Sequence, residues 1–244
     1  MKNYLSMGFG VNSVAMHLML LDQGIDFESV FVHHGTDWPE TYDYAAGFQW
    51  WLKAHGYKPV TILYPNKTIK KTGEHWDSLI DYCEDREVMP YRQRRWCTAD
   101  FKVRPLLKYC EAPCFQFIGI DAGESHRAKI STDAGIEHRW PLIEQGIDRE
   151  GCKKIIADHG LPIPRKSGCY ICPFQRKSQW KELRVKHPCL FSRAVALEQV
   201  GMKKSMMKSG KEYPLAHKPL PDLVNENQQS LFEEMEYPPC QCGL

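Results

Sequence analysis

Cysteines are the residues whose types and spacing most directly suggest chemistry in this chain. There are ten in 244 residues, and Cys169 and Cys172 stand in a Cys-x-x-Cys-Pro segment. A tight turn over that spacing brings two sulfurs to one metal, and backbone N–H groups of the turn can hydrogen-bond them. In a reducing compartment such an excess of cysteine indicates metal ligation or thiol chemistry more than disulfides.

Three interpretations of the Cys169–Cys172 turn remain open. It could hold an iron–sulfur cluster, a structural zinc ion, or a redox-active dithiol. The proline that follows Cys172 is common beside ferredoxin-like clusters and favours iron–sulfur over zinc. The dithiol ranks third, because the turn has no thioredoxin-like βαβ surroundings.

A glycine-rich segment near the start of the chain could bind an anion. It reads Ser6-Met-Gly8-Phe9-Gly10-Val-Asn12-Ser13. If it joins a strand to a helix, its backbone N–H groups and the helix N-terminus can surround a phosphate or sulfate. The alternative is a tight strand-to-helix connection in which Asn12 or Ser13 only caps the helix.

The elements that must position these residues alternate along the first half of the chain. β-Branched and aromatic runs predict strands over residues 4–7, 29–33, 60–63 and 115–120, and apolar periodicity predicts helices over 13–23 and 39–55. This alternation is typical of an α/β fold with an open, mainly parallel twisted sheet and helices on both faces. Right-handed crossovers would place all the strand carboxyl ends at one edge, where ligands bind.

The character of the sequence changes after about residue 141. Helices are predicted over 148–159, 179–186 and 190–206, with a Pro/Gly-rich loop over 160–168. We therefore expect a nucleotide-binding α/β domain over 1–145, a helical metal-cluster region packed on it over 146–212, and a polar, proline-dotted tail over 213–244.

The composition is that of a folded protein, with 43% hydrophobic and 25% charged residues. No window approaches the ~18 apolar residues that a membrane span requires, and the first residues do not form a secretory signal, so we expect a cytoplasmic protein. The net charge is only +2, but six Lys and Arg fall within 92–108 and four within 203–211. Either cluster could contact a polyanion, although a solvated helix face is favoured for the second.

The glycine-rich segment resembles the PP-loop, Ser-Gly-Gly-Lys-Asp-Ser, of the PP-loop ATP pyrophosphatase superfamily. Gly8, Gly10 and Ser13 match, whereas Val11 and Asn12 replace the lysine and the aspartate. This form is similar to the loop of phosphoadenosine phosphosulfate (PAPS) reductases, which bind a sulfonated nucleotide. Without the lysine, a cation that would neutralise phosphate is lost, so the resemblance implies nucleotide binding more than ATP hydrolysis.

Two further segments resemble motifs of the same PAPS reductase-like branch. Residues 33–41 resemble Asp-Thr-Gly-x-Glu-x-Pro-Glu-Thr, with a His pair at 33 and 34 that we expect to be structural or solvent-facing. Residues 119–127 resemble Gly-Ile-Arg-x-x-Glu-Ser-x-Arg, where Arg127 would clamp a phosphate or only pair with Glu124. The resemblance implies nucleotide contacts by Ser6, Gly8, Phe9, Gly10, Asn12, Ser13, Gly35, Asp37, Lys102, Gly119, Glu124, Ser125 and Arg127.

A fourth match concerns the metal. The segment around Cys97 resembles Cys-Cys-x-x-x-Lys-x-x-Pro-Leu, with Thr98 in place of the second cysteine, and the Cys169–Cys172 turn resembles a later Gly-Cys-x-x-Cys. In adenylylsulfate-type reductases such cysteines hold a 4Fe–4S cluster. We therefore predict ligation by Cys97, Cys169 and Cys172. Cys189 is the assigned fourth ligand, with Cys152, a tail residue or an open iron site as alternatives.

The chain ends in Cys242-Gly-Leu, which resembles the Glu-Cys-Gly-Leu-His ending that carries the nucleophilic cysteine of the reductases. The resemblance assigns Cys242 a catalytic role, although the flanking Glu and His are absent. An inert tail is the alternative.

Together the four motifs indicate a PAPS reductase-like protein, similar to members from phages or mobile elements. The first functional hypothesis is ATP- or adenylate-dependent sulfur transfer onto a nucleotide or nucleic acid, with a protein sulfur or electron donor and a homo-oligomeric assembly. The second is thiol-dependent PAPS or adenylyl sulfate reduction with release of sulfite. The third is a non-catalytic nucleotide-sensing module with a structural zinc.

Overall fold

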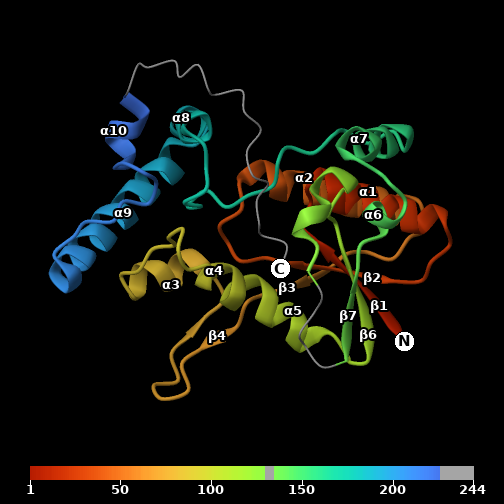
Figure 1. Ribbon diagram of the computed structural model, residues 1–244, viewed down its shortest axis with the longest axis horizontal. Coiled ribbons are helices and arrows are strands. Elements are labelled where there is room, and N and C mark those ends of the chain that lie inside the picture. Colours follow the sequence, from red (N-terminus) through yellow and green to blue (C-terminus); the bar gives the residue numbers. More distant parts are fainter. Residues whose placement is uncertain (130–134, 226–244) are drawn as a thin grey trace.

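The centre of the molecule is a five-stranded parallel sheet. In this computed structural model, which describes residues 1–129 and 135–225, the strands run in the order β3-β2-β1-β6-β7 (Figure 1). They are β1 (Lys2–Met7), β2 (Glu28–Val32), β3 (Thr61–Leu63), β6 (Cys114–Ile118) and β7 (Ile136–Arg139), and each neighbouring pair is parallel. The α/β fold with a parallel sheet is therefore confirmed.

Four of these strands were predicted from their apolar runs, and β7 was not. Its sequence, Ile-Glu-His-Arg, is half-buried or exposed throughout and lies at the edge of the sheet. An edge strand needs little apolar surface, so its signal in the sequence is weak. A small antiparallel pair, β4 (Lys67–Thr68) with β5 (His75–Trp76), was also not predicted.

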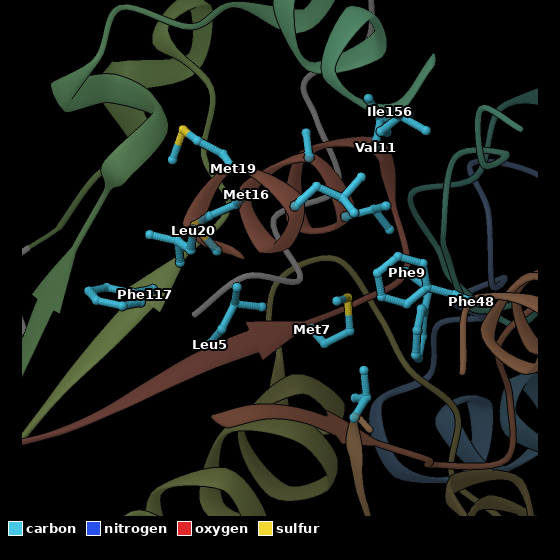
Figure 2. Close-up of a cluster of buried hydrophobic side chains, with 14 of the residues drawn as sticks. Leu5, Met7, Phe9, Val11, Met16, Met19, Leu20, Phe48, Phe117 and Ile156 are labelled. Atoms are coloured by element: carbon cyan, nitrogen blue, oxygen red, sulfur yellow. The ribbon is translucent and has the colours of Figure 1, made fainter. Parts of the chain in front are cut away.

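Side chains of β1 alternate between two cores on opposite faces of the sheet. Leu5 and Met7 point to one face, where they pack with α1 (Val11–Asp22), α2 (Pro39–Ala54) and α7 (Arg149–Asp158). Figure 2 shows this core, with Phe48 and Ile156 among its members. Tyr4 points to the other face, where a smaller core contains Leu106 of α5 (Arg104–Tyr109). This period-2 pattern covers the sheet with helices on both sides.

One helical run leads into α5. It begins with α4 (Trp96–Thr98), passes through a π-helical turn over Ala99–Val103 and continues as α5. Cys97 therefore lies inside this helical run. The short α3 (Leu79–Asp85) precedes this run.

The C-terminal helices α8 (Lys177–Lys186), α9 (Pro188–Ser209) and α10 (Leu220–Asn225) share a third core. Trp38, from the start of α2, also belongs to this core. The predicted tail begins at residue 213, yet Leu215 and Leu220 are buried, and the Glu198 carboxylate accepts hydrogen bonds from their backbone N–H groups at 2.9 and 2.7 Å. Residues 213–225 thus pack against α9.

The remaining helical segments lie around the strand ends: a 3₁₀ segment over Ala122–Arg127 follows β6, and α6 (Pro141–Glu144) follows β7. Within the described ranges, no helix has the length and apolar content needed to cross a bilayer.

Candidate functional site

The glycine-rich loop joins β1 to α1 in a closed conformation. The Ser13 hydroxyl donates to the Gly10 carbonyl at 3.1 Å and accepts from the Gly8 N–H at 3.2 Å. Between them Phe9 has a φ of +49°, which is uncommon for a residue other than glycine. Its ring is buried against Phe31 and Phe48, at 4.9 and 6.2 Å between centroids, as Figure 2 shows for Phe48. Burial of Phe9 therefore holds the loop in its turn.

The first turn of α1 has backbone N–H groups that no N-cap side chain satisfies. The N-cap residue is Gly10, which has no side chain to cap the helix. The first N–H groups of a helix have no acceptor within it, and the helix dipole places partial positive charge there. The loop therefore offers backbone donors at a point that favours phosphate or sulfate.

Gly119 brings the end of β6 against this loop. A Cβ atom at position 119 would lie 3.0 Å from both Cα and N of Ser13, and 3.2 Å from the carbonyl carbon of Asn12. Strands β1 and β6 are neighbours, and the chain leaves them in opposite directions across the sheet, β1 toward β2 and β6 toward β7. This is the topological switch point of an open parallel sheet, where ligands bind outside the strand carboxyl ends.

Asn12 links the loop to two residues that the sequence did not identify. Its Nδ2 donates to Asp121 Oδ2 at 2.9 Å, and its Oδ1 accepts from the Arg149 guanidinium at 2.8 Å. Asn12 and Asp121 replace the Asp and the Arg of the two family motifs, and they contact each other here. An aspartate at position 12 would be repelled by the Asp121 carboxylate, whereas the Asn12 amide donates a hydrogen bond to it.

Arg127 lies near the same edge, in the 3₁₀ segment after β6. Its guanidinium forms an ion pair with Glu124 and its side chain is 13% exposed. This is the alternative that the sequence left open for Arg127. The phosphate clamp remains a prediction, as do the nucleotide contacts of Ser6, Glu124 and Ser125.

The cysteine turn packs beside the glycine-rich loop and the segment after β2. The backbone N–H of Trp38 donates to the Gly168 carbonyl at 3.0 Å, and the backbone N–H of Tyr170 donates to the Thr36 carbonyl at 2.8 Å. On the other side, a Cβ on Gly10 would lie 2.7 Å from the Ser167 hydroxyl. Residues 167–172 thus contact both of the other segments that the motifs singled out, 8–13 and 35–38.

A buried polar network joins these segments. Cys169 Sγ lies 3.0 Å from Thr36 Oγ1, which lies 2.7 Å from His34 Nδ1. The other ring nitrogen of His34 lies 3.1 Å from Asp37 Oδ2, and Lys102 Nζ lies 3.7 Å from Asp37 Oδ1. The side chain of His34 is fully buried, so of the structural and solvent-facing alternatives its position matches the structural one.

Burial and charge act in opposite directions on this network. Burial alone would raise the pKa of Asp37, but His34 and Lys102 outweigh it and bring the pKa to about 2. Burial lowers the pKa of His34, and burial also raises the pKa of the Cys169 thiol well above its usual value. Asp37 is therefore an anion that holds His34 and Lys102 in place.

The predicted metal ligands are only partly brought together. Cys97 and Cys172 are half-buried around the same core as Cys169, and the nearby Cys97 adds to the rise in the pKa of Cys169 that burial begins. Cys189 is exposed on α9, and Cys152 belongs to the core between the sheet and α7.

The described residues do not form a ready site for a cluster or an ion. Among residues 1–129 and 135–225, no three or more His, Cys, Asp or Glu side chains are grouped so that they could hold a metal. Iron–sulfur and zinc therefore stay predictions. Cys240 and Cys242 lie outside the described residues.

Comparison with known proteins finds a similar solved structure but no matching family model or curated protein. Among solved structures, the chain is similar to phosphoadenylyl-sulfate (PAPS) reductase from Candida auris, in a phosphate complex, with 19% sequence identity and a TM-score of 0.44. The match covers 67% of this chain and 75% of that one. What this chain binds must be argued from its own residues.

Proposed function

We propose that the chain binds an adenine nucleotide through the loop of residues 8–13 and uses it in sulfur chemistry. The observation that carries the proposal is the close approach of Gly119 to Ser13 at the switch point, 3.0 Å from a would-be Cβ to backbone atoms. Only glycines allow two strand-end loops to approach so closely around a phosphate.

The anion is the part of the ligand that the geometry supports. Backbone N–H groups of the first turn of α1 and the guanidinium of Arg149, anchored on Asn12, provide donors and positive charge on one side. Arg127 ends the 3₁₀ segment that follows β6. The loop has no lysine, so these groups would take over the neutralisation of phosphate or sulfate oxygens. The adenine base is inferred from the motif resemblance alone.

The reaction class is inferred from the cysteine turn. Ser167 contacts Gly10 of the glycine-rich loop, and Cys169 follows two residues later. In ATP-dependent sulfur transfer, the acceptor oxygen attacks the α-phosphorus of ATP and pyrophosphate leaves. A nucleophilic sulfur from a donor then attacks the carbon that bears this oxygen, and AMP departs with the oxygen. No step in this proposal passes through a metal.

The test is isothermal titration calorimetry of the full chain with ATP, adenylyl sulfate and PAPS. Ser13→Ala should lower the affinity about tenfold or more, because it removes the hydrogen bonds that close the loop. Ser209→Ala is the matched control, since Ser209 also donates its hydroxyl to a backbone carbonyl, at 2.9 Å on α9. Equal nucleotide affinities of the wild-type chain, Ser13→Ala and Ser209→Ala would refute the proposal. The absence of binding of any of the three nucleotides to the wild-type chain would also refute it.

Turnover assays separate the three functional hypotheses. Release of AMP with sulfur transfer to an acceptor supports the first hypothesis. Release of sulfite from PAPS or adenylyl sulfate supports the reductase, and Cys242→Ser should then abolish that release. Tight nucleotide binding without turnover supports a sensing module. Anaerobic purification followed by iron, sulfide and zinc analysis decides the metal question independently.

A further inference from the structure

Positive charge is concentrated in two stretches of the chain that contain no acidic residue. Residues 88–99 and 160–181 together hold eight Lys and Arg and no Asp or Glu, in a chain whose net charge is only +2. One of the eight, Arg165, pairs with Glu40 at 3.3 Å and Glu182 at 2.7 Å. The eight side chains together are a source of local positive potential, which Glu40 and Glu182 reduce at Arg165.

The fold joins these two stretches into one surface. Arg92 Nε donates to the Pro173 carbonyl at 2.9 Å, and its guanidinium lies 5.8 Å from the centre of the Phe174 ring. A bridge between Tyr91 and Arg94 makes the first stretch a tight turn with Arg92 and Arg94 exposed. We call the resulting surface the basic turn surface, and its members are Arg92, Arg94, Arg95, Phe174, Arg176 and Lys177.

The basic turn surface continues to the proposed nucleotide site. Phe174 is two residues beyond Cys172, and Ser167 at the other end of the same loop touches Gly10. Lys166 is exposed next to Ser167. A polyanionic chain lying on Phe174 could therefore extend toward the carboxyl ends of β1 and β6.

An exposed aromatic ring within this charge favours one class of polyanion. Phe174 is 40% exposed with Arg92 beside its ring, and an aromatic ring in a positively charged groove is the usual platform for an unstacked base. Duplexes hide their base faces, whereas single strands present them. We propose that the basic turn surface binds a single-stranded segment of nucleic acid, the substrate on which the chemistry of the neighbouring site acts. This inference rests on the proposed function for its catalytic consequence, but the binding itself is independent.

Fluorescence anisotropy with a labelled single-stranded oligonucleotide of about 20 nucleotides tests the proposal. Phe174→Ala should weaken single-strand binding about 5- to 100-fold, the usual range for loss of one base stack, and should leave duplex binding within twofold. Arg92→Ala with Arg94→Ala should weaken binding to both and reduce the steepness of the salt dependence by about 2. Arg94→Ala alone, an exposed substitution, should show half of that change in slope.

The matched control removes the same charge elsewhere. Lys203→Ala with Lys208→Ala, on α9, should leave binding within twofold. Equal losses in the two double variants would overturn the inference, as would unchanged single-strand binding in Phe174→Ala. Equal competition by polyglutamate, or tighter binding to anionic vesicles than to the oligonucleotide, would assign the surface to an acidic protein or a membrane and also overturn it. The ATP affinity of the Arg92→Ala/Arg94→Ala variant should equal that of the wild type. This would show that the loss of nucleic-acid binding does not come from damage to the proposed nucleotide site.

Discussion

Gly119→Ala should disable the nucleotide loop without unfolding the protein. The added Cβ would meet Cα and N of Ser13 at 3.0 Å and the carbonyl carbon of Asn12 at 3.2 Å. These are backbone atoms, so no side-chain rotation relieves the contact and the loop itself must shift. Forcing an extra methyl into a packed site costs about 1–3 kcal/mol. If that cost falls on the binding conformation, affinity for ATP drops about 5- to 150-fold.

Two comparison variants sharpen this prediction. Gly47 lies in α2 with nothing within 4 Å of a would-be Cβ, so Gly47→Ala should keep ATP affinity and raise stability by roughly 0.5–1 kcal/mol. Gly10→Ala meets only the end of the Ser167 side chain, at 2.7 Å. Adding Ser167→Ala to Gly10→Ala should therefore restore much of the ATP affinity that Gly10→Ala alone loses. Calorimetric titration measures the ATP affinity, and thermal melting measures the stability. An ATP affinity of Gly119→Ala within twofold of wild type would refute the predicted clash.

Three further predictions concern other parts of the structure. Burial lowers the pKa of His17 to about 3, so the unfolded chain takes up a proton below about pH 6.5 that the folded chain does not. Stability should fall by about 2 kcal/mol between pH 7.5 and 5, and His17→Gln should remove most of this loss in urea denaturation. Arg149→Ala should lower ATP affinity about tenfold by releasing Asn12, whereas Lys153→Ala, on the same helix, should not; equal affinities in titration would count against this role. Thr36→Val should destabilise the fold by about 1–3 kcal/mol, because it removes a hydrogen-bond partner of His34 in a buried network; an unchanged denaturation midpoint would show that the network contributes nothing.

The main sheet could be predicted because its central strands are buried on both faces. Strands β1, β2 and β6 read as apolar or aromatic runs, and each is followed by a helix or by a glycine turn. Edge strand β7 and the packed segment over residues 213–225 could not be predicted. Their positions depend on partners far away in the sequence, such as the Glu198 carboxylate that binds Leu215 and Leu220.

The candidate site could be predicted where a motif keeps its residues together. Gly8, Gly10, Ser13 and Gly119 lie at the switch point as the motif order implied, although their contact with a nucleotide is untested. Arg149 escaped prediction because it lies 137 residues from Asn12, and no local pattern marks it. For His34 the sequence left a structural and a solvent-facing position open, because its burial depends on the contacts with Asp37 and Thr36 that the fold brings about.

The central claim is that an anionic nucleotide binds between the carboxyl ends of β1 and β6. The most direct measurement is the change in backbone amide NMR shifts of the ¹⁵N-labelled full chain on addition of ATP, with adenosine as the reference without phosphate. Binding at this edge of the sheet predicts ATP-specific shifts at residues 8–13 and 119–127 that disappear in Gly119→Ala. Shifts confined to other regions, or identical shifts with adenosine, would contradict it.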